Sequence, residues 1–175
     1  MTDVSKFFSD LENKLSEKFG DEFISGNEFH GTVSVSVKSK KILDILEYCV
    51  FDVDLKLTFL TDLTAVDYLE MEAPGRLAVV YCLRNVDNMN QVLIKAFLPA
   101  DETEIDSAVG MWSSAEWLER EVWDLFGIKF KGNPNLKRIL LPDDYEGHPL
   151  LKDYPLKGRG ERDSFKVIQR ESGRY

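Results

Sequence analysis

Proline spacing divides this chain of 175 residues into two parts that cannot fold in the same way. Four of its six prolines fall within 22 residues near the C-terminal end: Pro134, Pro142, Pro149 and Pro155. Proline has no backbone N–H to donate and fixes φ, so this spacing excludes a long helix or a central strand there. The sequence therefore predicts a folded domain over residues 1–127 and an extended, Pro/Gly-punctuated tail over residues 128–175.

Residue periodicity predicts the first elements of the folded domain. Residues 5–19 repeat apolar side chains at helical spacing, and Gly20 follows as a natural stop. After a turn expected around Gly26, residues 32–38 alternate strictly between apolar and polar, as a half-buried strand does. Ser39 is then expected to cap a second amphipathic helix.

Further apolar runs predict strands over residues 55–63, 77–83 and 92–98. The turns between them are short, which suits antiparallel hairpins, because a parallel crossover needs about a dozen residues or more. The acidic run 101–106 is expected to be a solvated loop. Together these elements predict an α+β domain, with an antiparallel or mixed sheet and helices packed on one of its faces.

A charged amphipathic helix is expected over residues 114–126, where it ends the folded domain, and Gly127 is expected to stop it. Its N-cap is expected to be one of two serines, Ser107 or Ser114. Glu116, Arg120 and Asp124 are spaced four residues apart, which predicts an ion-pair ladder with the cation in the middle. Glu121 is expected to share a helix face with Asp124.

The tail beyond this helix does not have the composition of a linker. It carries nine bulky apolar or aromatic side chains: Leu136, Ile139, Leu140, Leu141, Tyr145, Leu150, Leu151, Tyr154 and Leu156. Ordering an extended chain costs roughly 1–2 kcal/mol per residue, so the tail needs hydrogen-bond partners outside itself. Such a segment is typical of a chain that lies across another protein, and we expect a protein partner.

Charge and hydropathy exclude two other kinds of partner. Residues 1–127 carry 11 Lys and Arg against 24 Asp and Glu, whereas residues 128–175 carry 11 against 7. An acidic domain cannot neutralise phosphates, so nucleic acid is not expected as a ligand. No run approaches the roughly 20 apolar residues of a spanning helix, and the N-terminal residues do not read as a signal or transit peptide. Contact with a membrane is expected only through other proteins.

No catalytic, cofactor-binding or metal-ligating site is visible in the sequence. Cys49 and Cys82 read as buried free thiols, and no pair of Cys or His stands at metal-ligand spacing. Glu119 and Glu121 are two positions apart, which points them about 200° apart on a helix and argues against paired-carboxylate catalysis. His148 lies in a turn-rich setting, where a hydrogen bond to backbone is favoured over an acid–base or ligand role.

Residues 119–128, Glu-Arg-Glu-Val-Trp-Asp-Leu-Phe-Gly-Ile, resemble the signature of the 30-kDa (C) subunit of respiratory complex I, the proton-pumping NADH:quinone oxidoreductase. Further segments follow in the order found in that family: residues 136–141, 144–150 and 152–156. Upstream, residues 63–67 and 115–118 are also similar. Two positions depart from the pattern, since the family usually has His in place of Asn133 and Arg in place of Leu151.

The resemblance implies a non-catalytic peripheral-arm subunit of bacterial type. It would support assembly and stability of the quinone-reducing module while electrons pass from NADH to quinone and protons are translocated. It implies no redox cofactor in this chain, because FMN, iron–sulfur clusters, NADH and quinone are bound by other subunits. It also implies a position on the cytoplasmic side of the inner or plasma membrane, with the tail along the 49-kDa (D) subunit.

The resemblance further implies two groups of interface residues. The first orients the helix at the subunit junction: Glu119, Arg120, Glu121 and Asp124. The second lies in the tail: Arg138, Asp144, His148, Pro149, Lys152, Asp153, Tyr154 and Pro155. Two other functions stay open, namely the equivalent subunit of a membrane-bound nickel–iron hydrogenase or formate hydrogenlyase, and a free-standing acid–base hydrolase.

Overall fold

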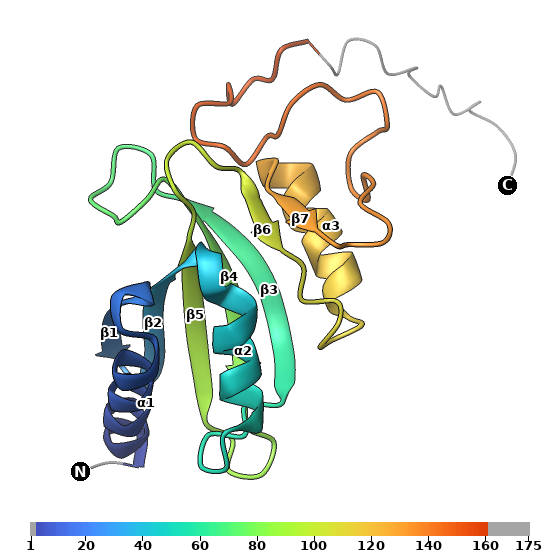
Figure 1. The fold of residues 1–175 in the computed structure, drawn as a ribbon. Helices are drawn as coiled ribbons and strands as arrows, with labels where there is room; N and C mark the ends of the chain where they lie inside the picture. The colour runs from blue at the N-terminus through green and yellow to red at the C-terminus, as the bar shows by residue number, and fades with distance from the viewer. Residues whose placement is uncertain (1–2, 161–175) are drawn as a thin grey trace, which may run out of the picture.

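A five-stranded mixed sheet in the order β1-β2-β5-β4-β3 forms the centre of the chain (Figure 1). A computed structural model describes residues 3–160. The helices are α1 (Asp3–Phe19), α2 (Ile42–Phe51) and α3 (Ala115–Phe126), with short 3-10 turns η1 (Gly20–Glu22) and η2 (Ser39–Lys41). The strands are β1 (Phe23–Phe29), β2 (Thr32–Lys38), β3 (Phe59–Asp67), β4 (Leu77–Arg84), β5 (Gln91–Phe97), β6 (Glu104–Asp106) and β7 (Lys129–Lys131).

The main core lies between one face of this sheet and the helices α1 and α2, which Figure 1 shows in front of the strands. Val35, Ile94 and Tyr81 pair across β2, β5 and β4, and all three are fully buried on that face. The β3–β4 and β4–β5 pairs are antiparallel, whereas β2 and β5 run parallel. The expected α+β class, with helices on one face of a mixed sheet, is confirmed.

The expected turn around Gly26 is wrong, because Gly26 lies within β1. A Cβ there would come within 2.8 Å of the Phe8 ring, so glycine lets α1 pack closely on the strand. The turn comes later, at His30 and Gly31, where φ is 50° and 82°. Positive φ at both positions is the geometry of a tight type I′ hairpin, which joins β1 to β2.

The strand expected over residues 55–63 begins later, at Phe59, and runs to Asp67. Leu55 and Leu57 alternate with polar neighbours because both are buried in the turn before β3, not because they belong to a strand. Lys56 between them has φ 45°, which excludes extended backbone at that residue.

The acidic run 101–106 is not simply a solvated loop, and regular structure does not end at Gly127. Residues Glu104–Asp106 form β6, which pairs in parallel with β7 just after α3. Ile105 opposite Phe130 explains the pairing, because both side chains are buried against the core while their charged neighbours face outward. Local periodicity cannot predict this pairing, because α3 separates the two strands in the sequence.

After β7 the described tail, residues 132–160, contains turns and bends but no helix or strand. It passes over the end of α3 in Figure 1. The rest of the predicted tail, from residue 161 onward, lies outside the described residues. Among residues 3–160, no helix is long and apolar enough to cross a membrane.

Candidate subunit interface

Helix α3 spans the predicted residues and buries polar as well as apolar side chains. Gly127 has φ 78° and its N–H donates to the carbonyl of Trp123 at 2.9 Å, so the helix ends where the sequence predicts. Neither serine caps its start. Ser114 occupies the N-cap position without a side-chain hydrogen bond, and the Ser107 hydroxyl donates to Glu119 at 2.7 Å.

The predicted ladder through Glu116, Arg120 and Asp124 does not form. Asp124 is fully buried and pairs with Arg138 of the tail, at 2.6 Å between Oδ1 and Nη1. Glu121, three positions before Asp124 on the same helix, is exposed, because the tail covers Asp124 but not Glu121. Asp124 pairs with Arg138 of the tail and not with Arg120 of its own helix. The buried Asp124–Arg138 pair is screened less by the solvent than an ion pair on the helix surface would be.

Asp124 is the point where the tail is fixed to the domain. Its Oδ2 accepts hydrogen bonds from the backbone N–H groups of Ile139, Leu140 and Leu141 at 2.9–3.0 Å. Burial by itself raises the pKa of Asp124, but these N–H groups and Arg138 favour the carboxylate and hold the pKa below its ordinary value. A charged aspartate inside the chain therefore organises three consecutive tail residues.

Arg138 extends this arrangement to the next turn of the tail. Its Nη2 donates to the carbonyls of Tyr145 at 2.6 Å and Gly147 at 3.2 Å. The guanidinium also lies over the rings of Trp123 and Tyr145, 5.7 Å from each centroid. Because arginine presents several donors in a fixed plane, one side chain can hold α3 and both ends of the 138–147 loop together.

Two further side chains fix the backbone at this junction. Arg120 donates to the carbonyls of Lys137 and Arg138, both at 3.1 Å, and lies over the Trp117 ring. The Nδ1 of His148 hydrogen-bonds the carbonyl of Asp124 at 2.9 Å, which is the backbone role expected for that histidine. The junction of α3 and the tail is thus held chiefly by side chain to backbone bonds.

Glu119 makes a second buried cluster on α3. It is fully buried and accepts from Ser107 Oγ and Ala108 N–H, both at 2.7 Å, and from Asn133 Nδ2 at 2.8 Å. Burial raises the pKa of Glu119, although these three donors oppose the rise. Asn133 therefore has a clear role: its amide ties the residues after β7 to the helix.

A third cluster at the end of β3 holds the tail farther along. Asp67 is buried and accepts from Arg76 Nε at 3.1 Å, from Arg76 Nη2 at 3.0 Å and from the Lys152 N–H at 3.0 Å. Arg76 also pairs with Asp153 at 2.8 Å. Lys152 is thus held through its backbone, while its ammonium lies 3.2 Å from the sulfur of Met71. Sequence reasoning missed Arg76, which has no local signal.

The remaining predicted interface residues do not join these clusters. Glu121 and Asp144 are exposed. The Tyr154 hydroxyl lies 2.9 Å from that of Tyr145, and Pro149 and Pro155 help to line a groove of about 1000 Å³ in the tail. Leu151, where the resembled family usually has Arg, packs partly buried against the core. Whether any of these residues contacts another subunit stays a prediction.

The hydrogen-bond partners that the tail needs outside itself come, for residues 132–160, largely from the folded domain of the same chain, so these bonds do not by themselves require a second protein. Asp124, Asp67 and Arg138 supply partners from within the chain, and Leu150 N–H donates to the carbonyl of Leu125 at 3.0 Å. Apolar side chains of this ordered stretch still face outward. Leu140 is 60% exposed and Leu150 50% exposed, and Leu156 is fully exposed.

Acid is expected to detach the tail from α3. The lowered pKa values of Asp124 and Asp67 stabilise the folded chain above their unfolded-state pKa of about 3.9, and this stability is lost as pH falls through the folded values. Glu119 has the opposite sign, because its raised pKa removes stability as pH rises through it. Amide chemical shifts of residues 139–141, followed from neutral pH downward, should change in an acid transition that Asp124→Asn abolishes.

Gly127→Ala is expected to loosen the junction between α3 and the tail. Left-handed backbone costs a non-glycine residue about 1–2 kcal/mol, and the new Cβ would lie 2.7 Å from the His148 ring. Thermal unfolding should report a lower Tm and faster exchange of the Leu150 N–H. Gly110→Ala is the matched control, because nothing lies within 4 Å of a Cβ there. Equal Tm values for the two variants would show that Gly127 is not needed for the junction between α3 and the tail.

Among residues 3–160, no three His, Cys, Asp or Glu side chains gather closely enough to hold a metal ion. The expectations about cofactors and catalysis stay predictions. What the described geometry does provide is a surface segment with outward apolar side chains, whose backbone is fixed by buried carboxylates.

Comparison with known proteins identifies the family to which this chain belongs. The family described as respiratory-chain NADH dehydrogenase, 30 Kd subunit, matches residues 35–160. A protein of Citrifermentans bemidjiense, named as the C subunit of NADH-quinone oxidoreductase, is 48% identical over 153 residues, which cover 87% of this chain and 92% of that protein. Its namesake from Geobacter sulfurreducens is 44% identical over the same shares of both chains.

Solved structures agree on the fold. A trypsin-resistant fragment of Nqo5 superposes with a TM-score of 0.61 at 28% identity, covering 72% of this chain and 98% of the fragment. A chain of the membrane-bound sulfane sulfur reductase, an archaeal respiratory membrane complex, gives a TM-score of 0.71 at 22% identity, covering 95% and 98%. The match over residues 35–160 and the close relatives establish that this chain belongs to the 30-kDa subunit family of the respiratory-chain NADH dehydrogenase.

Proposed function

We propose that this chain is the C-type subunit of an NADH:quinone oxidoreductase and acts there as a scaffold. It supports assembly and stability of the quinone-reducing module in the peripheral arm and performs no chemistry itself. In this proposal the 49-kDa (D) subunit is the partner of the tail. FMN, iron–sulfur clusters, NADH and quinone are bound by other subunits, and the chain lies on the cytoplasmic side of the bacterial inner or plasma membrane.

The main observation behind the proposal is that a segment of the tail exposes apolar side chains while its backbone is held on the domain. Asp124 and Arg138 fix the backbone of residues 138–147 from inside, while Leu140 and Leu150 stay half or more exposed. Exposed apolar groups that gather on one segment mark protein interfaces. A preordered loop also loses less conformational entropy on binding, which raises affinity without adding contacts.

The structure of a relative supports different roles for the two parts of the chain, with a stable domain and a tail that binds a partner. That structure is described as a trypsin-resistant fragment, residues 1–134 of Nqo5, so part of that protein resists protease as a unit. The fragment aligns with 72% of this chain. We infer that residues 1–127 form the corresponding stable body here, and that residues 128–175 are the partner-binding segment.

The relatives favour this function over the alternatives. Proteins that are 43–48% identical over 87% of this chain are named as the C subunit of NADH-quinone oxidoreductase. The sulfane sulfur reductase chain shares the fold at 22% identity, which does not favour a hydrogenase-like complex. Nothing in the described geometry favours a free-standing hydrolase, because Glu119 is buried and bonded whereas Glu121 is exposed.

Leu150→Asp in the complete complex tests the proposal. A carboxylate in the contact is expected to reduce copurification of the 49-kDa subunit with the peripheral arm and to lower NADH:quinone activity in membranes. Val86→Asp is the matched control, because Val86 is also more than half exposed but lies in the β4–β5 turn, far from the tail in sequence. Unchanged assembly and activity with Leu150→Asp would contradict the proposed interface.

A further inference from the structure

A shallow groove of about 580 Å³ lies between α1 and α2. Its floor is aromatic, because the rings of Phe19 and Tyr48 meet edge to face with their centroids 5.7 Å apart. Phe51, one turn farther along α2, also lines the groove and is 73% exposed. Its rim is acidic, since Asp44 and Glu47 are exposed on the same side of α2. The groove between α1 and α2 therefore offers aromatic rings and carboxylates, the two kinds of group that bind an organic cation.

The chain itself places a cation in this groove. The Nζ of Lys18 lies 4.0 Å from the centroid of the Tyr48 ring and 6.0 Å from that of Phe19. The Lys18 side chain is exposed and forms no ion pair with any residue in the range 3–160. An exposed ammonium that lies over a ring without a carboxylate partner is held only weakly, so another cation can displace it.

The acidic rim of the groove has carboxylates to spare. Within the described part of the chain, neither Asp44 nor Glu47 forms an ion pair. Asp52 at the end of the groove differs, because both of its oxygens accept from Lys14 Nζ, at 2.7 and 2.9 Å. Residues one helical turn apart have Cβ atoms about 5–6 Å apart, so one guanidinium can reach the carboxylates of both Asp44 and Glu47.

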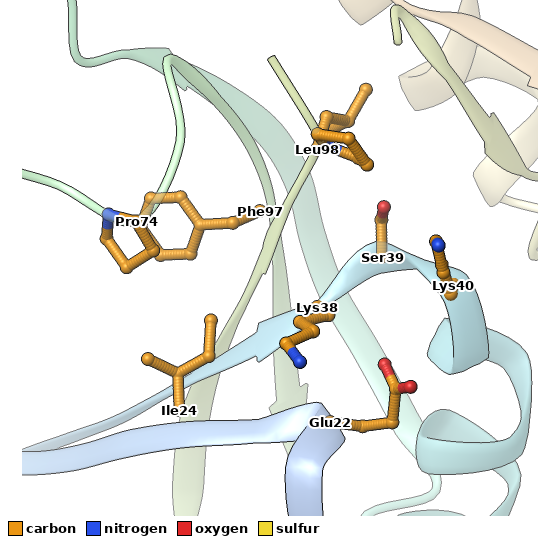
Figure 2. Close-up of a pocket in the computed structure, with 9 residues that line it drawn as sticks. Glu22, Ile24, Lys38, Ser39, Lys40, Pro74, Phe97 and Leu98 are labelled. Carbon is orange, nitrogen blue, oxygen red and sulfur yellow. The ribbon is translucent and has the colours of Figure 1, made fainter. Parts of the chain in front are cut away.

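The groove between α1 and α2 is more open to a ligand than the pocket of about 480 Å³ at the ends of β2 and β5, which Figure 2 shows. In that pocket Phe97 and Leu98 are only 6% and 2% exposed. Its exposed charged groups are Lys38 and Lys40, and no exposed aromatic ring accompanies them. Only the groove between the helices combines exposed charge with an exposed ring.

We propose that the groove between α1 and α2 binds an arginine side chain of a neighbouring polypeptide. The guanidinium takes the place of the Lys18 ammonium over the Tyr48 ring. It pairs there with Asp44 and Glu47, while apolar residues beside the arginine pack on the exposed Phe51 ring. Arginine fits this groove better than lysine does, because its planar guanidinium stacks on a ring and presents paired donors to carboxylates.

The charge and shape of this surface select a protein as the partner. Residues 1–127 carry 24 acidic against 11 basic residues, so the phosphates of nucleic acid and of anionic lipid are repelled. A free small cation would keep only weak contacts, because the groove is shallow and water screens exposed ion pairs. A polypeptide adds apolar contact with Phe51 and with Val53 just beyond it, which are 73% and 76% exposed.

The first test titrates the purified full chain with the capped pentapeptide acetyl-Gly-Leu-Arg-Leu-Gly-amide. The amide chemical shifts of Tyr48 and Phe51 should change saturably. The same peptide with glutamine in place of arginine should bind about tenfold more weakly, because the contact with the ring and the ion pairs are both lost. Equal binding of the two peptides, or binding of acetyl-arginine amide as tight as that of the pentapeptide, would overturn the inference.

Lys18→Ala should change the affinity in the opposite direction. Removing the competing ammonium is expected to tighten binding of the arginine peptide about threefold. Lys6→Ala is the matched control, since it removes the same charge from an exposed position of the same helix outside the groove. Weaker or unchanged binding in Lys18→Ala, relative to Lys6→Ala, would show that the cation does not occupy the position over Tyr48.

The double variant Asp44→Asn/Glu47→Gln tests the acidic rim. It should weaken binding of the arginine peptide about tenfold, because two ion pairs are lost. Asp101→Asn/Glu102→Gln is its matched control, since it removes two exposed carboxylates outside the groove and should leave the affinity unchanged. Equal affinities of the two double variants would overturn the inference.

The last test uses the assembled complex, because the source of the neighbouring polypeptide rests on the proposed function. A photoreactive amino acid in place of Phe51 should crosslink to another subunit beside an arginine, as mapped by mass spectrometry. Crosslinks only to segments without arginine, or none, overturn the inference while the complex remains assembled. Failure of the unaltered chain to copurify with the other subunits would instead contradict the proposed function.

Discussion

Replacing Asp124 with asparagine is expected to release the tail from α3 while the sheet and its helices stay folded. Removing one partner of a buried ion pair costs about 3–5 kcal/mol, because the other charge is left without compensation. Here Arg138 can escape that cost by carrying the tail into water, so the damage stays local. Hydrogen exchange at the amides of Ile139, Leu140 and Leu141 should become fast, while the amides of β4 and β5 keep their protection.

Glu121→Gln is the matched control for this prediction. It removes the same charge from the same helix, but the Glu121 side chain is exposed. Its exchange pattern should match that of the unaltered chain. If residues 139–141 remain protected in Asp124→Asn, the carboxylate does not hold the tail and another contact must do so.

Glu119→Ala is expected to lower the stability of the whole chain. Three donors would lose their acceptor, namely Ser107 Oγ–H, the Ala108 N–H and the Asn133 amide. An unsatisfied buried donor costs about 1–3 kcal/mol, and this cost applies to the Ala108 N–H, which is fully buried, whereas Ser107 and Asn133 are only half-buried and can be solvated. For a chain of this size a loss of about 1–3 kcal/mol corresponds to a fall in Tm of about 2–12 °C.

The loss should be global because Glu119 joins segments that lie on both sides of the helix in the sequence. Ser107 follows β6 and Asn133 follows β7, so the cluster closes the parallel pair around α3. Glu116→Ala removes a carboxylate from the first turn of the same helix and should cost less than about 1 kcal/mol. A Tm for Glu119→Ala equal to that of Glu116→Ala would show that the buried cluster is not a structural link.

Local patterns in the sequence were sufficient to predict most of the fold. The apolar spacing of α1 and α3, and the short turns of the β3–β4–β5 meander, each correspond to an observed element. Errors arise where nearby residues do not decide the structure. The β6–β7 pair depends on contact between Ile105 and Phe130 across a helix, and Leu55 and Leu57 alternate within a turn.

The candidate site was predictable as a set of residues but not as an arrangement. Asp124 and Arg138 stand in motifs that the sequence analysis quoted, yet helical spacing assigned Asp124 to Arg120. Only the folded chain brings residues 14 positions apart to 2.6 Å. The burial of Glu119 was equally hidden, because a charged residue at that helix position reads as solvent-facing until the tail and the 107–108 segment cover it.

Buried carboxylates of the domain order the tail before any partner binds. Hydrogen exchange of the free, unaltered chain at neutral pH is the measurement that decides this, with the assembled complex measured beside it. We expect slow exchange in the free chain for the amides of residues 139–141, which donate to Asp124, and for that of Lys152, which donates to Asp67. Exchange at the rate of an unstructured peptide in the free chain, with protection only in the complex, would contradict it.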